Sequence, residues 1–310
     1  MDQNPAASSD RYTTPYNAVV HTLHYDSGRL ADFLIDHPRV VVLTGAGISA
    51  ASGIPTYRDQ HGTWLHRAPI QERAFLQDEH TRRRYWARSW HGWPVMRDAL
   101  PNPAHVALAQ LEEWGWIELL ITQNVDRLHQ RAGSRNVVDL HGRVDRVRCL
   151  TCATVQSRNS IQELLARENQ WSDASQHSPR PDGDMEVPDE SHARLLLPRC
   201  PLCAGDLKPD VVFFGGSVPT AKVHTCLNAL ERADALLVIG SSLMLYSGYR
   251  FCRRASQLGK PMVIINPGVT RADALAQLRI HAPAEALLTQ TLQHLGQRVR
   301  RSPCAPGNPS

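Results

Sequence analysis

An apolar run passes directly into a glycine-rich turn in the segment Val40-Val41-Val42-Leu43-Thr44-Gly45-Ala46-Gly47-Ile48-Ser49-Ala50. Four consecutive apolar residues between Pro38 and this turn predict a short, fully buried strand. The turn fits the pattern G-x-G-x-x-G/A, which lets backbone amides and the start of a helix approach a pyrophosphate. The segment that follows this turn differs from that of an ordinary dinucleotide-binding site. Pro55 cuts the helix short, and no second strand delivers a ribose-binding acid about 20 residues further on.

Apolar runs and helical patterns alternate along most of the chain. This alternation predicts an α/β fold, with a mostly parallel sheet that helices cover on both faces. We expect strands at 40–43, 116–121, 137–140, 211–214, 235–239 and 262–265, and helices at about 17–36, 103–114, 161–168, 220–232, 246–258 and 283–295.

Polar side chains follow several of these strands at the point where each strand ends. In an open α/β sheet, ligands bind beyond the carboxyl ends of the strands, so one pocket can use all of these side chains. Each of them taken singly is at least as consistent with a turn or a helix cap. Their shared position favours the joint role of Gln123, Asn124, Asp126, Ser241, Ser242 and Asn266.

Two CxxC pairs supply four cysteines, Cys149 and Cys152 followed by Cys200 and Cys203. Four thiolates suit tetrahedral Zn²⁺ and leave no open position for catalysis, so the pairs predict a structural zinc site. The alternative is four ordinary buried cysteines. The polar stretch 171–192, which lies between the pairs, is typical of a long surface insertion.

Composition favours a globular protein, since 42% of the 310 residues are hydrophobic and 21% are charged. The net charge of +4 comes from scattered basic residues, so nucleic-acid binding is not indicated. Seven cysteines are an odd number and argue against a disulfide framework. No run approaches the ~20 apolar residues of a membrane span, and residues 1–16 lack the apolar core of a signal peptide. We therefore expect a cytoplasmic protein without membrane association.

Several motifs, in order along the chain, resemble the successive signatures of the sirtuins, which are NAD-dependent protein-lysine deacylases. The resemblance extends from about Ala31 to Leu288. It is closest to the class II branch in the segments 84–88, 142–147 and 245–251. The motifs that carry it are Thr44–Ser49, Gly53–Arg58, Thr122–Asp126, Leu140–Gly142, the paired cysteines, Lys208–Gly215, Gly240–Ser242 and Ile265–Gly268.

The resemblance implies a Rossmann-like, doubly wound parallel sheet with a small zinc-binding domain inserted. The expected division is a flexible N-terminus at 1–16, a Rossmann-like NAD-binding domain at 17–142 and 204–298, a zinc domain at 143–203 and a flexible tail at 299–310.

The resemblance also implies a mechanism in which the acyl-lysine amide oxygen is held against the nicotinamide ribose while nicotinamide leaves. Asn124 and Asp126 would contact ribose, ordered water and the nicotinamide amide. His141 would be the general base for a ribose hydroxyl, a role that suits its unperturbed pKa of about 6.5. The products would be free lysine, nicotinamide and O-acyl-ADP-ribose.

NAD and an acylated-lysine protein or peptide are the implied ligands. The predicted NAD contacts are Gly45, Ala46, Gly47, Ser49, Thr56, Tyr57, Arg58, Gln123, Asn124, Val125, Asp126, Gly240, Ser241, Ser242, Asn266, Pro267 and Gly268. The peptide would add as a strand along Val212, Phe213, Phe214 and Gly215 on one side and Tyr246 to Gly248 on the other.

Three positions depart from the family pattern. Thr56 stands where an Asp is usual, Arg127 where a small residue is usual, and Gly216 where an acid is common. Each could reshape the pocket or lie at its rim.

Tyr85 and Arg88 resemble a Tyr/Arg pair that selects acidic acyl chains in one sirtuin class. The downstream sequence puts them out of register, so we expect them to pack on a helix surface and we expect neutral acyl chains to be preferred. Mono-ADP-ribosyl transfer at the same site and a non-enzymatic, zinc-bearing binding module are the alternative functions.

Overall fold

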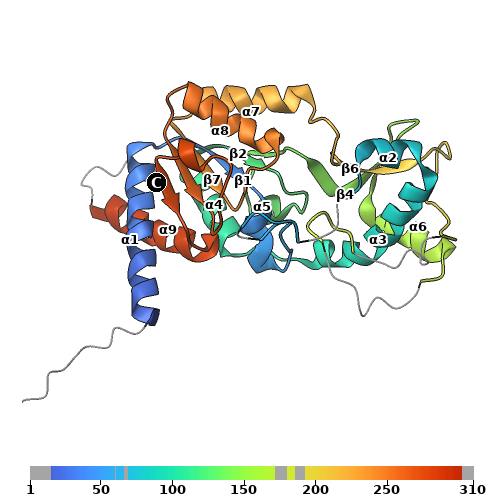
Figure 1. The fold of residues 1–310 in the computed structure, drawn as a ribbon, viewed down its shortest axis with the longest axis horizontal. Helices are drawn as coiled ribbons and strands as arrows, with labels where there is room; N and C mark the ends of the chain where they lie inside the picture. The colour runs from blue at the N-terminus through green and yellow to red at the C-terminus, as the bar shows by residue number, and fades with distance from the viewer. Residues whose placement is uncertain (1–14, 60, 66–68, 172–179, 186–192, 302–310) are drawn as a thin grey trace, which may run out of the picture.

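The computed structural model describes residues 15–59, 61–65, 69–171, 180–185 and 193–301. The described chain forms a larger unit on a six-stranded sheet and a smaller unit on a three-stranded sheet (Figure 1). None of the helices in this part of the chain is both long and apolar enough to cross a lipid bilayer.

The larger sheet is parallel throughout, with the strand order β3-β2-β1-β7-β8-β9. This order confirms the predicted Rossmann-like, doubly wound sheet, because the strands run outward in both directions from the boundary between β1 and β7. The strands are β1 (Val40–Thr44), β2 (Ile117–Thr122), β3 (Val137–Asp139), β7 (Ala235–Ile239), β8 (Met262–Ile265) and β9 (Leu278–Ile280).

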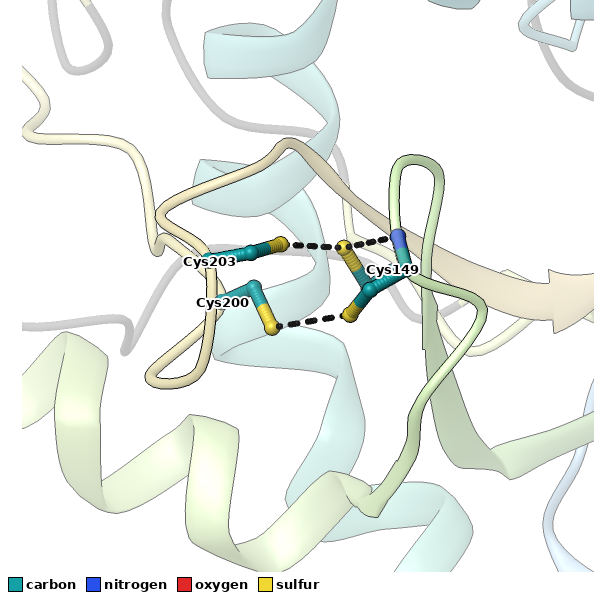
Figure 2. A group of neighbouring side chains, drawn as sticks. Cys149, Cys200 and Cys203 are labelled. Carbon is teal, nitrogen blue, oxygen red and sulfur yellow. Dashed lines mark hydrogen bonds between the residues drawn. The ribbon is translucent and has the colours of Figure 1, made fainter.

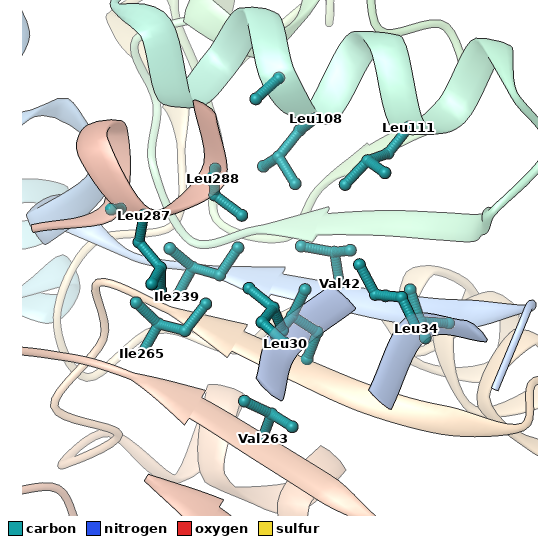
Figure 3. Close-up of a cluster of buried hydrophobic side chains, with 14 of the residues drawn as sticks. Leu30, Leu34, Val42, Leu108, Leu111, Ile239, Val263, Ile265, Leu287 and Leu288 are labelled. Carbon is teal, nitrogen blue, oxygen red and sulfur yellow. The ribbon is translucent and has the colours of Figure 1, made fainter. Parts of the chain in front are cut away.

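Helices cover both faces of this sheet because successive side chains of a strand point to opposite faces. In β1, Val40 and Val42 enter one apolar core, while Val41 and Leu43 enter the other. Figure 3 shows Val42 packed among leucines of the first core. That core is covered by α1 (Pro15–Asp36), α4 (Pro103–Glu113) and α9 (Ala284–Arg301), and the second by α7 (Thr220–Arg232) and α8 (Tyr246–Gln257).

The smaller unit has an antiparallel sheet with the strand order β5-β4-β6. The prediction of a strand at 211–214 in the larger sheet was wrong. The strand in this region is β6, which lies at 207–211 and pairs with β4, so it belongs to the smaller unit. The elements of this unit are α2 (Glu72–Gln77), α3 (Glu79–Asp98), β4 (Gly142–Cys149), β5 (Val155–Ser157), α6 (Arg158–Glu168) and β6 (Leu207–Val211).

One apolar core joins these elements except β5. It includes Phe75 and Trp86 from α2 and α3, Val147 from β4, Ile161 from α6 and Leu207 from β6. On the basis of this packing, we propose that the smaller domain takes in α2, α3 and β6 as well as the expected residues 143–203.

Two helices extend further than their apolar patterns predicted. α1 begins at Pro15, inside the expected flexible N-terminus, and α9 continues to Arg301, inside the expected tail. Residues 1–14 and 302–310 lie outside the described residues.

The expectation that 171–192 is a surface insertion was wrong for its described middle part. Arg180 and Asp184 are each 3% exposed. Residues 172–179 and 186–192 lie outside the described part of the chain.

Candidate functional site

A cavity of about 790 Å³ lies at the carboxyl ends of β1, β2 and β7, where the strand order reverses. Its volume is in the range of small-molecule and cofactor sites. Every residue that the sequence predicted to be catalytic, to bind NAD or to contact the peptide lines this cavity, except Gly248. The segments that carry these residues, which are far apart in the sequence, therefore meet at one cavity.

The glycine-rich loop is shaped by a second loop that packs against it. Gly45 donates its N–H to the Ile239 carbonyl at 3.1 Å, and Gly47 donates to the Gly240 carbonyl at 2.8 Å. A Cβ atom on Gly47 would lie 2.8 Å from the Gly240 Cα atom, and one on Gly45 would lie 2.8 Å from the Ser241 Cβ atom. The glycines thus allow two loops to touch, and two of the amides expected to face a pyrophosphate are bonded within the protein.

The helix after this loop is the short 3₁₀ helix η1 (Ala46–Ser52), which ends at Gly53 with a φ of 83°. Its Ser49 hydroxyl donates to Asp126 Oδ2 at 2.7 Å and accepts from Asn124 Nδ2 at 3.0 Å. The other Asp126 oxygen accepts the Leu128 N–H at 2.9 Å. Burial raises the pKa of Asp126, and the hydrogen bonds from Leu128 and Ser49 partly offset that rise.

His141 follows β3 and hydrogen-bonds through both ring nitrogens. Nδ1 lies 3.0 Å from the Gln123 carbonyl oxygen, which fixes the proton on Nδ1. Nε2 lies 2.8 Å from the Ser247 hydroxyl, so it carries the lone pair and accepts. Burial lowers the pKa of His141 to about 4. The ring is therefore neutral at pH 7, and its pKa is lower than the value of about 6.5 on which the predicted role as a base relied, so Nε2 is a weaker base than in a free imidazole.

The predicted cofactor-loop residues Thr56, Tyr57 and Arg58 also line the cavity. The Thr56 hydroxyl donates to the Arg58 carbonyl at 2.9 Å, so it closes a local turn. The Arg58 guanidinium lies 4.0 Å from the centre of the Trp64 ring and donates to the Gly62 carbonyl at 2.7 Å. The Tyr57 ring contacts the Phe214 ring edge-on, with 5.8 Å between centroids.

The two peptide segments are placed differently from each other. Val212 donates its N–H to the His141 carbonyl at 2.8 Å, so the segment that follows β6 starts beside the candidate base. Tyr246 to Gly248, expected as an edge for a peptide strand, instead form the first turn of α8. Gly248 is buried against Gln123, and a Cβ atom there would lie 2.6 Å from Gln123 Oε1.

The four paired cysteines form one cluster in the smaller unit. Figure 2 shows Cys149, Cys200 and Cys203 of this cluster. All four sulfur atoms lie within 4.8 Å of one another, with 3.5 Å between Cys149 and Cys203 and 3.7 Å between Cys152 and Cys200. Four sulfurs bound to one zinc ion at about 2.3 Å lie about 3.8 Å apart, so the cluster fits tetrahedral zinc. The fit supports the predicted structural zinc, with no ligand position left open.

Comparison with known proteins decides the family. The sequence model of the Sir2 family matches residues 45–247. The "NAD-dependent protein deacetylase 2" of Bradyrhizobium diazoefficiens is 50% identical over 259 residues, which cover 84% of this chain and 95% of that protein. The chain belongs to the Sir2 family, the sirtuins. The resemblance seen in the motifs is thereby confirmed.

A further relative resembles this sirtuin in sequence, and a solved structure shares its fold. The "NAD-dependent protein deacylase Sirt4" of Drosophila melanogaster is 45% identical over 261 residues, which cover 83% of each chain. A solved structure described as "Sir2-p53 peptide-NAD+" has a TM-score of 0.70 and 30% identity, and the match covers 87% of this sirtuin and 98% of that chain.

The residues that depart from the family pattern have local explanations in this sirtuin. Arg127 has a φ of 69° and pairs with Asp139, so its side chain is held by β3. A Cβ atom on Gly216 would lie 1.8 Å from Glu72 Oε2. A carboxylate from α2 therefore occupies the space beside position 216, where an acid is common in the family.

Sequence reasoning missed part of the cavity wall. Tyr85, Pro181 and Asp182 line the cavity. Tyr85 and Arg88, expected to pack on a helix surface, lie on α3 and are both buried, with 4% and 7% exposure, and of the two only Tyr85 lines the cavity. The Arg88 guanidinium donates to Asp184 at 3.0 Å. The sequence contains an arginine on a helix and two aspartates, Asp182 and Asp184, in the insertion, which could have indicated an ion pair. Such a pair has no fixed spacing in sequence, so this signal is weak.

Proposed function

We propose that this sirtuin is an NAD-dependent protein-lysine deacylase that yields deacylated lysine, nicotinamide and O-acyl-ADP-ribose. One observation carries the proposal. The Gln123–Asp126 loop, a neutral His141 and the start of the 212–215 segment face one cavity at the sheet's topological switch point. The names of the relatives, deacetylase and deacylase, support it.

Some residues of this sirtuin would hold NAD in place, and another would transfer a proton. Gly45 to Gly47 and Gly240 to Ser242 form the floor at the strand ends, with Asn266 to Gly268 beside them. Asn124 and Asp126, fixed by Ser49, would orient the ribose and the nicotinamide amide. Bound NAD would supply the activated ribose and the leaving nicotinamide.

His141 would take a proton from a ribose hydroxyl through Nε2. Its Nδ1–H is held by the Gln123 carbonyl, which fixes the tautomer and the ring orientation. Ser247, now bonded to Nε2, would give way to the hydroxyl. Since burial lowers the pKa of His141 to about 4, the base form dominates at neutral pH.

Zinc would be structural, held by Cys149, Cys152, Cys200 and Cys203. Thiolate ligation of zinc requires reduced cysteines, which supports our proposal that the protein works in the cytoplasm.

Mass spectrometry of a peptide panel tests the function. Peptides with acetyl-, succinyl-, lipoyl- or long-chain acyl-lysine are incubated with and without NAD. We expect NAD-dependent loss of the acyl group and release of nicotinamide in equal amounts. Transfer of ADP-ribose to protein without loss of any acyl group would favour mono-ADP-ribosyl transfer. No nicotinamide release with any peptide or protein acceptor would contradict both.

A further inference from the structure

Arg127 has a backbone conformation that residues with a side chain rarely adopt. It lies between Asp126 and the short helix α5 (Leu128–Arg131), and its φ of 69° and ψ of 15° place it in the left-handed region. Glycine takes this conformation at no steric cost, whereas a Cβ atom makes it strained. The contacts of the arginine side chain must therefore offset the strain, and residues with such strain often lie at functional sites.

The Arg127 side chain connects two segments that meet at the cavity. Its guanidinium forms an ion pair with the Asp139 carboxylate, and the two side chains are only 21% and 14% exposed. The other Asp139 oxygen accepts from Gln130 Nε2 at 2.9 Å. Asp139 ends β3 two residues before His141, and Arg127 directly follows Asp126. One mostly buried ion pair thus joins the loop that ends in Asp126 to the strand end that carries the candidate base.

Asp126 uses both of its carboxylate oxygens as acceptors. Oδ2 accepts from the Ser49 hydroxyl at 2.7 Å, and Oδ1 accepts from the Leu128 N–H at 2.9 Å. A protonated carboxyl group has fewer acceptor sites and carries a donor, so protonation would disturb this arrangement. Because the Ser49 hydroxyl also accepts from Asn124 Nδ2, the ionised form of Asp126 holds Asn124 in place through Ser49.

The charge of Asp139 acts against the ionised form of Asp126. Burial raises the pKa of Asp126, hydrogen bonds from Leu128 and Ser49 lower it, and the negative charge of Asp139 raises it further. The guanidinium of Arg127 neutralises Asp139. Without this guanidinium, an unpaired and mostly buried carboxylate would remain, and its charge would favour protonation of Asp126.

The other arginines around Asp126 do not neutralise Asp139. Asp126 also lines a second cavity, of about 460 Å³, together with arginines of α3, α5 and β4. Each of these arginines is bonded to another group, and in the described part of the chain only Arg127 pairs with the Asp139 carboxylate. The charged groups that line this cavity with Asp126 are Arg97, Arg127, Arg131, Arg143 and Asp145, and His141 lines the first cavity with it.

We propose that Arg127 is a positioning residue for deacylation, an inference that rests on the proposed function. By neutralising Asp139, it keeps Asp126 ionised and so keeps Ser49 and Asn124 in place in the cavity. The family usually has a small residue at this position, so the arginine gives this sirtuin a contact that the family pattern lacks.

The pH dependence of kcat/KM tests the proposal, because it reports the ionisation of essential groups in the free enzyme. The full chain is assayed from about pH 5 to about pH 9 with the best acyl peptide from the panel. In Arg127→Gly, the acid limb of the profile should move to higher pH by about half a unit or more, because Asp139 is left unpaired. Arg127→Lys keeps the positive charge and should retain the wild-type limb. If Arg127→Gly does not fold, Arg127→Asn replaces it, since asparagine also tolerates the left-handed region.

A double variant separates the charge of Asp139 from general damage to the site. Adding Asp139→Asn to Arg127→Gly removes the unpaired carboxylate, so the acid limb should return to the wild-type position. The exposed Arg135→Gly, in the segment before β3, is the matched control and should keep the wild-type profile. The position of the limb compares rates within one preparation, so a partly inactive sample does not change it.

The proposal is overturned if Arg127→Gly keeps the wild-type acid limb, if the double variant keeps the limb of Arg127→Gly, or if Arg135→Gly moves the limb as far. Failure of the proposed function looks different, because then the wild type removes no acyl group from any peptide.

Discussion

Ser49 shows how single residues build this site. The sequence pointed to it as an NAD contact, because it belongs to the glycine-rich pattern. In the structure it is fully buried and connects the Asn124 amide to the Asp126 carboxylate. Its hydroxyl is one of the few groups that can accept from an amide and donate to a carboxylate at the same time. The sequence predicts a contact from this residue to NAD, while the structure adds a hydrogen bond to Asp126, which is 77 residues away and could not be read from the local pattern.

His141→Ala should remove deacylation while the fold and NAD binding are largely kept. Loss of a general base typically lowers the rate about 10²–10⁴-fold. Deacylation, nicotinamide exchange and NAD affinity are measured on one preparation, with the best acyl peptide from the panel. His224→Ala, an exposed histidine on α7, serves as the control and should behave as wild type. Near-native deacylation by the His141 variant would refute its role as the base.

Gly240→Ala should weaken both the fold and NAD binding. Gly240 has a φ of 61°, and a Cβ atom there would lie 2.4 Å from the Ile48 backbone nitrogen. The variant combines left-handed strain with a clash that pushes the glycine-rich loop away. Gly259→Ala is the matched control, since its φ is 65° and nothing lies within 4 Å of the Cβ position. Thermal unfolding and NAD titration compare the two, and equal losses in both variants would contradict the clash.

At the scale of elements, apolar runs predicted most of the larger unit. The strands β1, β2, β7 and β8 each form a short stretch that is buried on both faces, so their residues are almost all apolar. The smaller unit was harder to predict. α3 has arginines and a proline, Pro94, within its length, and several of its polar residues are buried by partners distant in sequence. Local pattern carries no information about such partners.

The start of α4 depends on a neutral histidine. Asn102 caps the helix, and its own N–H donates to His105 Nδ1 at 3.3 Å. Burial lowers the pKa of His105 to about 4 from an ordinary value of 6.5. The unfolded chain therefore binds this proton at higher pH than the folded chain does. The stability that neutral His105 provides is complete above about pH 6.5 and is lost as the pH falls towards about 4.

His105→Gln should flatten the pH dependence of stability in this window, because glutamine offers an acceptor that does not titrate. The wild-type loss from this group is on the order of 3 kcal/mol, converted from the shift in pKa. Urea unfolding at half-unit steps from pH 7 to pH 4 measures the slope. The exposed His224→Gln should retain the wild-type slope. An unchanged slope in the His105 variant would show that this histidine does not titrate with unfolding.

At the scale of the whole molecule, the larger and smaller units are stabilised in different ways. The larger unit has two apolar cores on a parallel sheet, and the smaller unit has one core and the cysteine cluster. A further apolar cluster packs α3 and β4 of the smaller unit against Ile54 and Leu128 of the larger unit. A small domain buries little surface, so we expect a zinc ion held by the cysteine cluster to add to the stability of the smaller unit.

Cys152→Ser should lower zinc content and thermal stability together. Three thiolates and a hydroxyl bind zinc less tightly than four thiolates, so the smaller unit should lose the stabilisation that zinc provides. Metal analysis and thermal unfolding measure both effects. Cys226 is a buried cysteine of the larger unit and lies outside the cluster, so Cys226→Ser serves as the control and should retain the zinc. A metal-free Cys152 variant with wild-type stability would contradict a structural role.

At this scale the sequence predicted the division into a nucleotide-binding sheet and a metal-bearing insertion. It failed for residues 180–185, because aspartate, arginine and proline are typical of exposed loops. Arg88 and Asp184, whose side chains lie 3.0 Å apart, are 96 residues apart in sequence. Residues that are far apart in sequence can form a buried ion pair, and no periodic pattern in the sequence indicates that their charges are buried.

The central position of β1 also affects how the protein is made. β1 pairs with β2 on one side and with β7 on the other, yet the smaller unit separates β3 from β7 in the chain. A ribosome that adds about 5–20 residues per second needs roughly 5–20 seconds to pass from Asp139 to Ala235. Throughout that time, one edge of β1, which is apolar except for Thr44, has no partner strand. We therefore expect a chain truncated before β7 to leave this edge of β1 unpaired and to aggregate more readily than the full chain.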